Sequence, residues 1–389
     1  MGLNKVDVEI TNGNLGQVAS NTDGITGFVV SGTATSQMPL NSGKVIFFTS
    51  DLAGLGITQT SHPAAYRHVT EFYAEKEGQE LWLMLCSPTT TMTAICDKNN
   101  NYAKKLVKDS GNRVRLIGIT REPGSGYTPT IQGGLDKDCY DALVKAHELA
   151  EYFASYEESS PLRILIEARS FTGNAADLTD LTTMDYNRAG LVLMSSKNDG
   201  SSSVALALGR KAGHPVHRKI SRTRSGALPI TECYVGTTSV KGYSGVSLIH
   251  DKGFITARTF AKKTGFYFTS DRMATALTDD YSSLARGCVI DKAHIIAYAT
   301  YTEELDDDVQ VDANGRIAPG VLKTLEAEIE NAVNTSMAGE ISSFDAFIDA
   351  NQNVLSTNET EIEMNVVPVG YNSNIKVKLG FKNPALTNS

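Results

Sequence analysis

The chain of 389 residues contains five cysteines, the side chains best suited to metal ligation or redox chemistry. They are scattered along the chain, their number is odd, and no two are spaced as C-x-x-C. Cys86 ends the apolar run 81–86, where a reduced cysteine packs as a small core residue. We therefore expect structural thiols, without a zinc site or a disulfide framework, at all five positions: Cys86, Cys96, Cys139, Cys233 and Cys288.

Two further features could bind a metal ion. His214 and His217 lie three residues apart, but the sequence around them supplies no third ligand, and a zinc site uses at least three protein ligands. The acidic loop 303–308 reads Glu-Glu-Leu-Asp-Asp-Asp and lacks the D-x-[DN]-x-[DN]-G order of a calcium loop. We expect neither a metal site nor a bound cofactor.

The motifs of common enzymes are also missing from the sequence. No G-x-x-x-x-G-K-[ST] is present to hold phosphates, and no G-x-G-x-x-G follows a strand. The segment 242–245, Gly-Tyr-Ser-Gly, lacks the spacing of a G-x-S-x-G nucleophile turn. Asp177, Asp180 and Asp185 lie in a loop, where aspartate is favoured for turn formation alone. We predict no catalytic residues and a protein that is not an enzyme.

One basic cluster stands out in a chain of net charge −8. The acidic balance argues against a nucleic-acid groove as the main function. Two interpretations of the cluster remain: a solvated loop after a helix, or a surface that meets an acidic region of a neighbouring copy and sets its register. We favour the contact between copies for Arg210, Lys211, Arg218, Lys219 and Arg222.

Strands and helices alternate through the first part of the chain, after a glycine-rich entry with Gly24, Gly27 and Gly32. Continuous apolar strands are expected at 44–48, 81–86, 114–120, 163–168 and 190–195. Helices are expected at 64–77, 89–109 (broken at 99–101), 136–156 and 201–212. Fully apolar strands between helices indicate an α/β fold with a largely parallel sheet flanked by helices.

The last third predicts a smaller α+β domain. A strand is expected at 291–298 and an amphipathic helix at 318–338, with an apolar stripe and charged residues on other faces. Two alternating strands follow at 361–367 and 374–381. We divide the chain into an N-terminal arm (1–20), an α/β domain (21–245), a C-terminal domain (246–365) and a C-terminal strand and arm (366–389).

Both ends of the chain alternate apolar and polar residues with the period of a half-buried strand. The apolar positions are Val6, Val8 and Ile10 at one end, and Ile375, Val377, Leu379 and Phe381 at the other. Each strand could pair within its own chain, or it could complete the sheet of another copy. Extended segments at both ends favour strand exchange between copies.

The composition is typical of a globular protein, with 41% hydrophobic and 21% charged residues. No apolar run approaches the ~20 residues that span a bilayer, and the first residues do not form a signal peptide. We therefore expect no membrane insertion and assembly in a bacterial cytoplasm.

Several segments of the last third carry a family resemblance. They are FYFTSDRM at 266–273, DKA at 291–293, GRI at 315–317, DANQNVL at 349–355, VVPVGY at 366–371 and IKVKLGF at 375–381. Weaker matches are ALALGR at 205–210, PVHR at 215–218 and SGAL at 225–228. Together with the helix 318–338, these segments resemble the tail sheath protein of contractile phage tails and related contractile injection systems.

The resemblance implies a structural subunit that polymerises helically around an inner tube and contracts to drive that tube through a target envelope. It implies three kinds of partner, which are further copies of the chain, the inner tail tube protein, and the baseplate and tail terminator proteins. The particle would be a virion tail or an injection system. By the same resemblance, a helix of the C-terminal domain faces the tube, and we assign that contact to Lys323, Glu326, Glu330 and Asn334.

Two other functions are compatible with the same elements. An α/β hydrolase or nucleotide-binding enzyme would share the parallel sheet, but it would need a convergent polar pocket, because a fold alone does not define a function. A tail tube or baseplate component is a third possibility, although tube proteins are usually much smaller single β-domains.

Overall fold

The computed structural model describes residues 22–381 and has at its centre a six-stranded sheet. The strand order is β2-β3-β1-β4-β7-β9, and every neighbouring pair is parallel except β2 with β3. The predicted α/β fold with a largely parallel sheet is confirmed. The strands of this sheet are β1 (Thr26–Ser31), β2 (Lys44–Ile46), β3 (Leu81–Cys86), β4 (Leu116–Ile119), β7 (Arg163–Glu167) and β9 (Ala189–Val192).

The central strand of the sheet, β1, was not predicted, because its residues lie in the glycine-rich segment at the start of the α/β domain. All six of its residues are buried, and Phe28 pairs with Leu83 on one side and Gly118 on the other. A Cβ atom at Gly118 would lie 2.5 Å from the Phe28 ring, so glycine leaves the space that this ring occupies. The glycines near β1 therefore permit close packing as well as turns.

Helices cover both faces of the sheet, as parallel strands require. On one face, α2 and α6 pack on each other and on β1 and β4; on the other, α4 and α5 pack on the sheet, and α3 packs on both of these helices. A Cβ atom at Gly209 of α6 would lie 2.5 Å from the carbonyl oxygen of Phe72, which shows how closely α2 and α6 approach. The bounds are α1 (Asp51–Gly54), α2 (Pro63–Glu75), α3 (Met92–Cys96), α4 (Ala103–Asp109), α5 (Lys137–Ala154) and α6 (Val204–Ala212).

Short hairpins and turns extend this body beyond the sheet. Ile255 forms a parallel bridge with Val192, so residues near 255 continue the sheet past β9. The main hydrophobic core runs on through Phe254, Phe266 and Leu284, and so includes residues as far as the start of α8. The elements are β5 (Ile131–Gln132), β6 (Leu135–Asp136), β8 (Asp185–Tyr186), β10 (Tyr234–Val235), β11 (Thr238–Ser239), α7 (Val246–Asp251), β12 (Ala257–Phe260), β13 (Lys263–Phe268) and β14 (Ala274–Thr275), with 3-10 turns at Thr22–Gly24, Ala175–Asp177, Leu181–Thr183, Thr223–Ser225 and Val240–Gly242.

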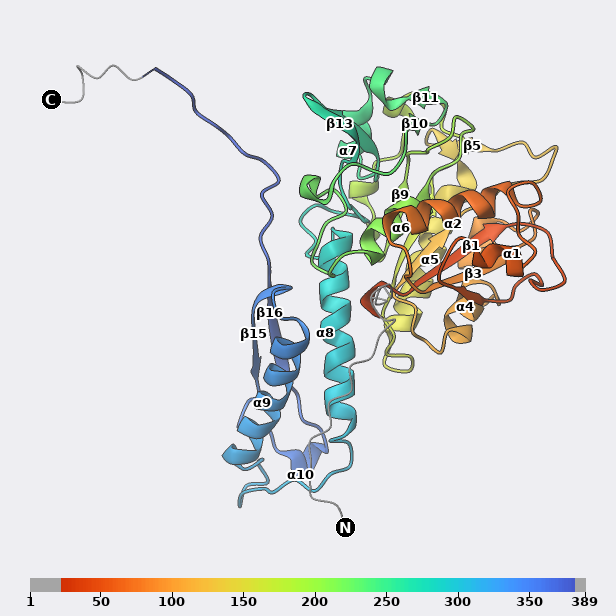
Figure 1. Ribbon diagram of the computed structural model, residues 1–389. Helices are drawn as coiled ribbons and strands as arrows, with labels where there is room; N and C mark the ends of the chain where they lie inside the picture. Colours follow the sequence, from red (N-terminus) through yellow and green to blue (C-terminus); the bar gives the residue numbers. More distant parts are fainter. Residues whose placement is uncertain (1–21, 382–389) are drawn as a thin grey trace, which may run out of the picture.

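The C-terminal part consists of helices and a two-stranded sheet beside the body (Figure 1). The long helix α8 contacts β7 of the body on one side and α9 and β16 on the other. A second core joins α8, α9 and the sheet through Val289, Ile329, Val333 and Phe344. The elements are α8 (Leu284–Thr302), α9 (Pro319–Ser336), β15 (Ile341–Phe347), α10 (Val354–Thr357) and β16 (Glu363–Pro368).

The predicted strand at 291–298 is wrong, because these residues lie within α8. Its buried residues include Val289, Asp291, Ala293 and Ala297, which contact two different neighbours. A helix packed on both sides lacks the single apolar stripe that identifies a surface helix, and this part of α8 alternates like a strand. The helix predicted at 318–338 is confirmed as α9, and its stripe residues Leu322, Ile329, Val333 and Met337 are buried.

Buried ion pairs join α8 to the rest of the chain. The Asp291 carboxylate accepts hydrogen bonds from the Arg163 guanidinium at 2.7 and 2.9 Å and from Arg188 at 2.9 Å. The Lys292 ammonium lies between the Asp23 and Glu340 carboxylates, at 2.7 and 2.8 Å. Burial disfavours the charged form of Lys292, but its two carboxylate partners outweigh this effect and raise its pKa. Electrostatic contacts therefore fix α8 between the body and the small sheet.

A helix that crosses a bilayer must be both long and apolar. No helix within residues 22–381 meets both requirements.

Candidate assembly interface

The strands β15 and β16 form a two-stranded sheet. In the described chain each strand is paired along one edge only, so both outer edges of the sheet are free. Phe344 pairs with Val366 and Ala346 with Met364 in antiparallel register. Phe344 and Ala346 are buried against the helices, whereas Phe347 and Val367 are exposed. An isolated pair of strands is marginally stable, and its free edges offer hydrogen-bonding groups to a further strand.

The free edges of β15 and β16 differ. The Glu330 carboxylate of α9 accepts a hydrogen bond from the backbone amide of Ala346 at 3.2 Å, and Glu326 accepts one from Ile348 at 3.0 Å. One amide of β15 and the amide just after it are thus satisfied by side chains of the same chain. Neither free edge has a neighbouring strand within residues 22–381, but α9 carboxylates bind amides only on the β15 side, so the edge of β16 is the more available of the two.

These contacts correct the assignment of tube-facing residues on α9. Glu326 is buried, and hydrogen bonds from Lys323 and from the Ile348 amide lower its pKa. Glu326 therefore does not face outward, and Glu330 is half-buried with a carboxylate oxygen committed to β15. Lys323 and Asn334 are exposed, and their contact with a tube stays a prediction.

The C-terminal arm, residues 369–381, leaves the C-terminal sheet as a single extended segment (Figure 1). No strand forms at 374–381, and this segment has no strand partner within the described chain. Ile375 and Val377 are each 79% exposed, Leu379 96% and Phe381 fully. Four apolar side chains at alternate positions in solvent are typical of a strand that awaits a partner. Pairing within the chain and exchange between copies therefore both stay predictions for residues 374–381, which have no strand partner among the described residues.

The start of the arm is fixed to the body by Tyr371. Its hydroxyl donates a hydrogen bond to the His217 carbonyl, and the Lys219 ammonium lies 4.5 Å from the centre of its ring. Burial raises the pKa of the Tyr371 hydroxyl to about 12. The arm is therefore anchored at one point and free beyond it.

The basic cluster divides into a buried and a surface part. Arg210 is buried on α6 and pairs with Glu75 at 2.7 Å, while Lys211 donates to the carbonyls of Val216 and Arg218. The prediction that Arg210 and Lys211 contact another copy is wrong, because their charges are satisfied inside the body. Arg218 and Lys219 are half-buried and Arg222 is exposed, so these three remain candidates for such a contact.

The predicted N-terminal strand, with Val6, Val8 and Ile10, lies outside the described residues. The described chain begins at Thr22, beside the ion pair of Asp23 with Lys292. Lys292 also binds Glu340, the residue before β15. The first described residues therefore lie next to the C-terminal sheet.

The cysteines, Asp180 and Ser244 lie in surroundings that suit a role in folding. Burial raises the pKa of the Cys86 and Cys233 thiols to about 12, and within residues 22–381 all five cysteines are free. Asp180 caps a 3-10 turn through the Thr182 amide, and Ser244 is exposed in the turn before α7. A search of residues 22–381 for three or more His, Cys, Asp or Glu side chains placed to hold a metal ion finds no such group.

Two family models together match nearly the whole chain. The N-terminal domain of DUF2586 matches residues 3–272, and the C-terminal domain of DUF2586 matches residues 280–386. The chain belongs to the DUF2586 family. A search of curated protein sequences finds no match.

Solved structures show which class of fold the chain has. A chain of the anti-feeding prophage baseplate in its contracted state matches at TM-score 0.64 and 12% identity, over 100% of both chains. A chain of the contracted helical sheath of the anti-feeding prophage matches at 0.62 and 13%, over 98% of this chain and 99% of that chain. The contracted PVC sheath complex, of an extracellular contractile injection system, matches at 0.61 and 11%, over 98% of both. The chain therefore has a contractile sheath fold.

Proposed function

We propose that the protein is a structural subunit of a contractile sheath, which polymerises helically around an inner tube and contracts to drive it through a target envelope. The observation that carries the proposal is an extended segment with exposed apolar residues at alternate positions, together with an open two-stranded sheet, among the described residues of one chain. The likeness in fold to sheath chains over the full length supports it. The role is structural and non-enzymatic.

The C-terminal arm of one copy adds as a strand to the C-terminal sheet of another. We place it at the free edge of β16, because Glu330 and Glu326 already bind an amide of β15 and the amide that follows this strand. Each backbone hydrogen bond gained contributes about 0.5–1.5 kcal/mol net. Each large apolar side chain moved from solvent to a buried site adds about 1.5–3 kcal/mol. Val377 and Leu379, both exposed in the single chain, supply such burial.

The N-terminal arm, residues 1–20, makes a second exchange through Val6, Val8 and Ile10. The position of Asp23, which shares Lys292 with Glu340 at the start of β15, supports this assignment, because the described chain begins near that sheet. A head-to-tail contact of this kind is heterologous, and it propagates into a helix when the rotation between copies does not close.

Exchanged arms allow the bodies to move while the copies stay connected. Hinges at 12–16 and 368–374 would absorb the change of direction, with the Tyr371 anchor in the second of them. Arg218, Lys219 and Arg222 would meet an acidic surface of a neighbouring body and set its register. The extended sheath would be a metastable state, and contacts made between bodies on contraction would supply the work.

The remaining partners follow from the same function. Lys323 and Asn334, the exposed members of the predicted set on α9, would contact the inner tube protein. The ends of the polymer would contact baseplate and tail terminator proteins. The assembled particle would be a phage tail or an injection system built in a bacterial cytoplasm.

Electron microscopy of the purified full chain tests this function. We expect striated hollow tubes in negative stain. A variant without residues 1–12 should remain a folded monomer and form no tubes. Normal tubes from that variant would contradict the exchange of the N-terminal arm. A full chain that stays monomeric even when a purified tube protein is added would contradict the sheath function.

A further inference from the structure

The acidic charge of the chain is concentrated at one end of the C-terminal part. Segments 303–323 and 349–363 contain ten Asp and Glu residues against Arg316 and Lys323. Their balance of −8 equals the formal net charge of the whole chain, so the other residues are balanced in number. These segments join α8 to the first turn of α9, and β15 to the start of β16. Figure 1 shows α10 among them, at the end away from the body, and we call this surface the acidic end.

The carboxylates of the acidic end have no cationic partners. Each of them is exposed apart from the half-buried Glu304, and none forms an ion pair in the part of the chain that the structure describes. Two apolar side chains lie among them, since Leu305 is 73% exposed and Leu355 is 68% exposed. A protein that covers this surface would bury apolar area as well as neutralise charge, which a metal ion would not do.

The opposite charge gathers in the loop after α6. Residues 200–231 contain six Lys and Arg and no Asp or Glu. Arg210, Lys211 and Lys219 have partners inside the body. The remaining three form no ion pair within residues 22–381, and two of them are exposed: Arg218, Arg222 and Arg224, of which the last two are exposed. We call residues 213–226 the basic loop.

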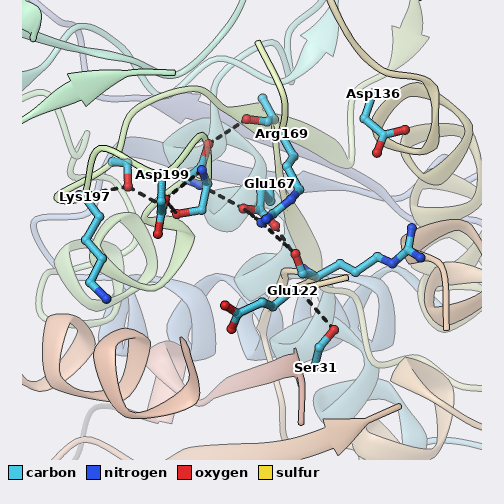
Figure 2. A network of polar contacts seen from close by, with 12 residues as sticks. Ser31, Glu122, Asp136, Glu167, Arg169, Lys197 and Asp199 are labelled. Carbon is cyan, nitrogen blue, oxygen red and sulfur yellow. Dashed lines mark hydrogen bonds and ion pairs between the residues drawn. The ribbon is translucent and has the colours of Figure 1, made fainter. Parts of the chain in front are cut away.

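The positive charge of the basic loop is felt by its own histidine. Burial lowers the pKa of His214, and the charges of nearby arginines, Arg210, Arg218 and Arg222, lower it further. Charges elsewhere in the body are more often paired. At the carboxyl edge of the large sheet, for example, Glu167 accepts a hydrogen bond from Arg169 at 3.3 Å (Figure 2).

The basic loop and the acidic end cannot neutralise each other within one chain. Val216 of the basic loop packs near Val289, in the first turns of α8. The acidic end begins at Glu303, which follows the last turn of the same helix. The 19 residues of α8 span about 28 Å at 1.5 Å for each residue. Charges in solvent are screened beyond about 10 Å at 0.1 M salt. Each surface therefore finds its complement only on another molecule.

We propose that the acidic end of one copy docks on the basic loop of the next copy. This inference rests on the proposed sheath function, and it identifies the acidic surface that the basic loop meets. Because the two surfaces lie at opposite ends of α8, the contact is head-to-tail and repeats along a polymer. Opposite charges steer the approach of the copies and set their register.

Charge reversal in the full chain tests the contact. One variant combines Arg222→Glu with Arg224→Glu, and the other combines Asp307→Lys with Asp308→Lys. All four side chains are exposed, so both variants should fold. Each variant alone should form no tubes, and its association in sedimentation should be weaker by about tenfold or more, because attraction between copies becomes repulsion.

Two rescues separate a direct contact from a general effect of charge. A mixture of the two variants should assemble, because every reversed surface then meets a reversed surface on its neighbour. The chain with all four substitutions should assemble alone, and its net charge is again −8. Raising the salt from ~0.05 M to ~0.5 M should weaken association of the native chain.

The control is Lys98→Glu with Lys197→Glu, which reverses two cations of the body that form no ion pair among the described residues. It should assemble like the native chain. Normal tubes from either reversal variant would overturn the contact and leave the sheath function standing. A mixture that assembles no better than its components would also overturn it. Salt-sensitive native oligomers that never become tubes, but that both reversals abolish, would support the contact and contradict the sheath. If one variant fails to fold, the other and the salt dependence still decide.

Discussion

The α/β body and the C-terminal arm differ in where their extended segments place apolar side chains. The central strand β1 is buried along its whole length between two neighbouring strands. The arm 374–381 instead has apolar residues only at alternate positions, and each of them lies in solvent. The body is therefore stabilised by contacts within one chain, whereas the proposed exchange would stabilise the arm through contacts with another copy. Substitutions should separate these two kinds of stability.

Asp291→Ala should have the largest effect on folding. It removes the partner of the buried Arg163 and one partner of Arg188, and so leaves an uncompensated charge between the body and α8. Breaking a buried pair in this way costs about 3–5 kcal/mol of unfolding free energy. Denaturant unfolding of the unassembled chain measures it. The exposed Asp280→Ala is the matched control and should change the value by less than about 0.5 kcal/mol.

Gly209→Ala should destabilise the body by about 1–3 kcal/mol, because the added methyl group would lie 2.5 Å from the Phe72 carbonyl oxygen. Gly320→Ala on α9 is the matched control, since nothing lies within 4 Å of its Cβ position. Alanine favours a helix over glycine by up to about 1 kcal/mol, so the control should be neutral or stabilising. Thermal unfolding compares the two variants. Equal effects would contradict close packing of α2 on α6.

Acid should weaken the fold through its histidines. Burial, the largest cause in each case, lowers the pKa of six histidines below the ordinary value of 6.5, namely His68, His147, His214, His217, His250 and His294. Below pH 6.5 the unfolded chain binds protons that the folded chain does not. This stability is present above pH 6.5 and is lost as the pH falls towards the folded-state pKa values.

We therefore expect the unfolding temperature to fall between pH 7 and pH 5.5. Each histidine contributes less than about 1.4 kcal/mol per pH unit. Calorimetry across this range measures the slope, and His250→Gln should reduce it. A stability that is constant or rises towards pH 5.5 would show that the histidines charge freely in the folded chain.

The double variant Val377→Asp with Leu379→Asp should have the smallest effect on folding. Both side chains are exposed in the single chain, so the unfolding free energy should change by less than about 0.5 kcal/mol. Polymerisation should be lost, because two carboxylates would enter the shared sheet. Sedimentation and negative-stain microscopy measure this loss. The control Lys376→Asp with Lys378→Asp changes the opposite face of the strand and should retain tubes.

Local patterns were sufficient to predict most of the body. The bounds of β3 were predicted at 81–86, and α5 lies within the predicted helix 136–156, because each has one clear period and one clear environment. The strand β1 was missed because Gly27 suggests a turn. A Cβ atom there would lie 2.8 Å from the Leu106 side chain, so this glycine serves packing. Only the tertiary structure reveals that requirement.

The candidate interface could be predicted only where it depends on a regular spacing of apolar residues in the sequence. The alternation of the arm and the apolar stripe of α9 are visible in the sequence. The roles of Glu330 and Arg210 are not, because a glutamate that binds a strand amide and an arginine paired with Glu75 look like ordinary surface charges. Asp291 was assigned to a strand, since its pairing with Arg163 crosses 128 positions of the chain. Such contacts leave no local signal.

The central claim is that residues 374–381 complete a sheet in another copy of the chain. The most direct measurement is a cryo-EM map of assembled tubes at a resolution that traces the backbone. We predict that these residues form a strand hydrogen-bonded to the β15–β16 sheet of a neighbouring subunit, at the edge of β16. An arm that folds back onto the sheet of its own chain, or that pairs with no sheet in the assembled tube, would contradict the account.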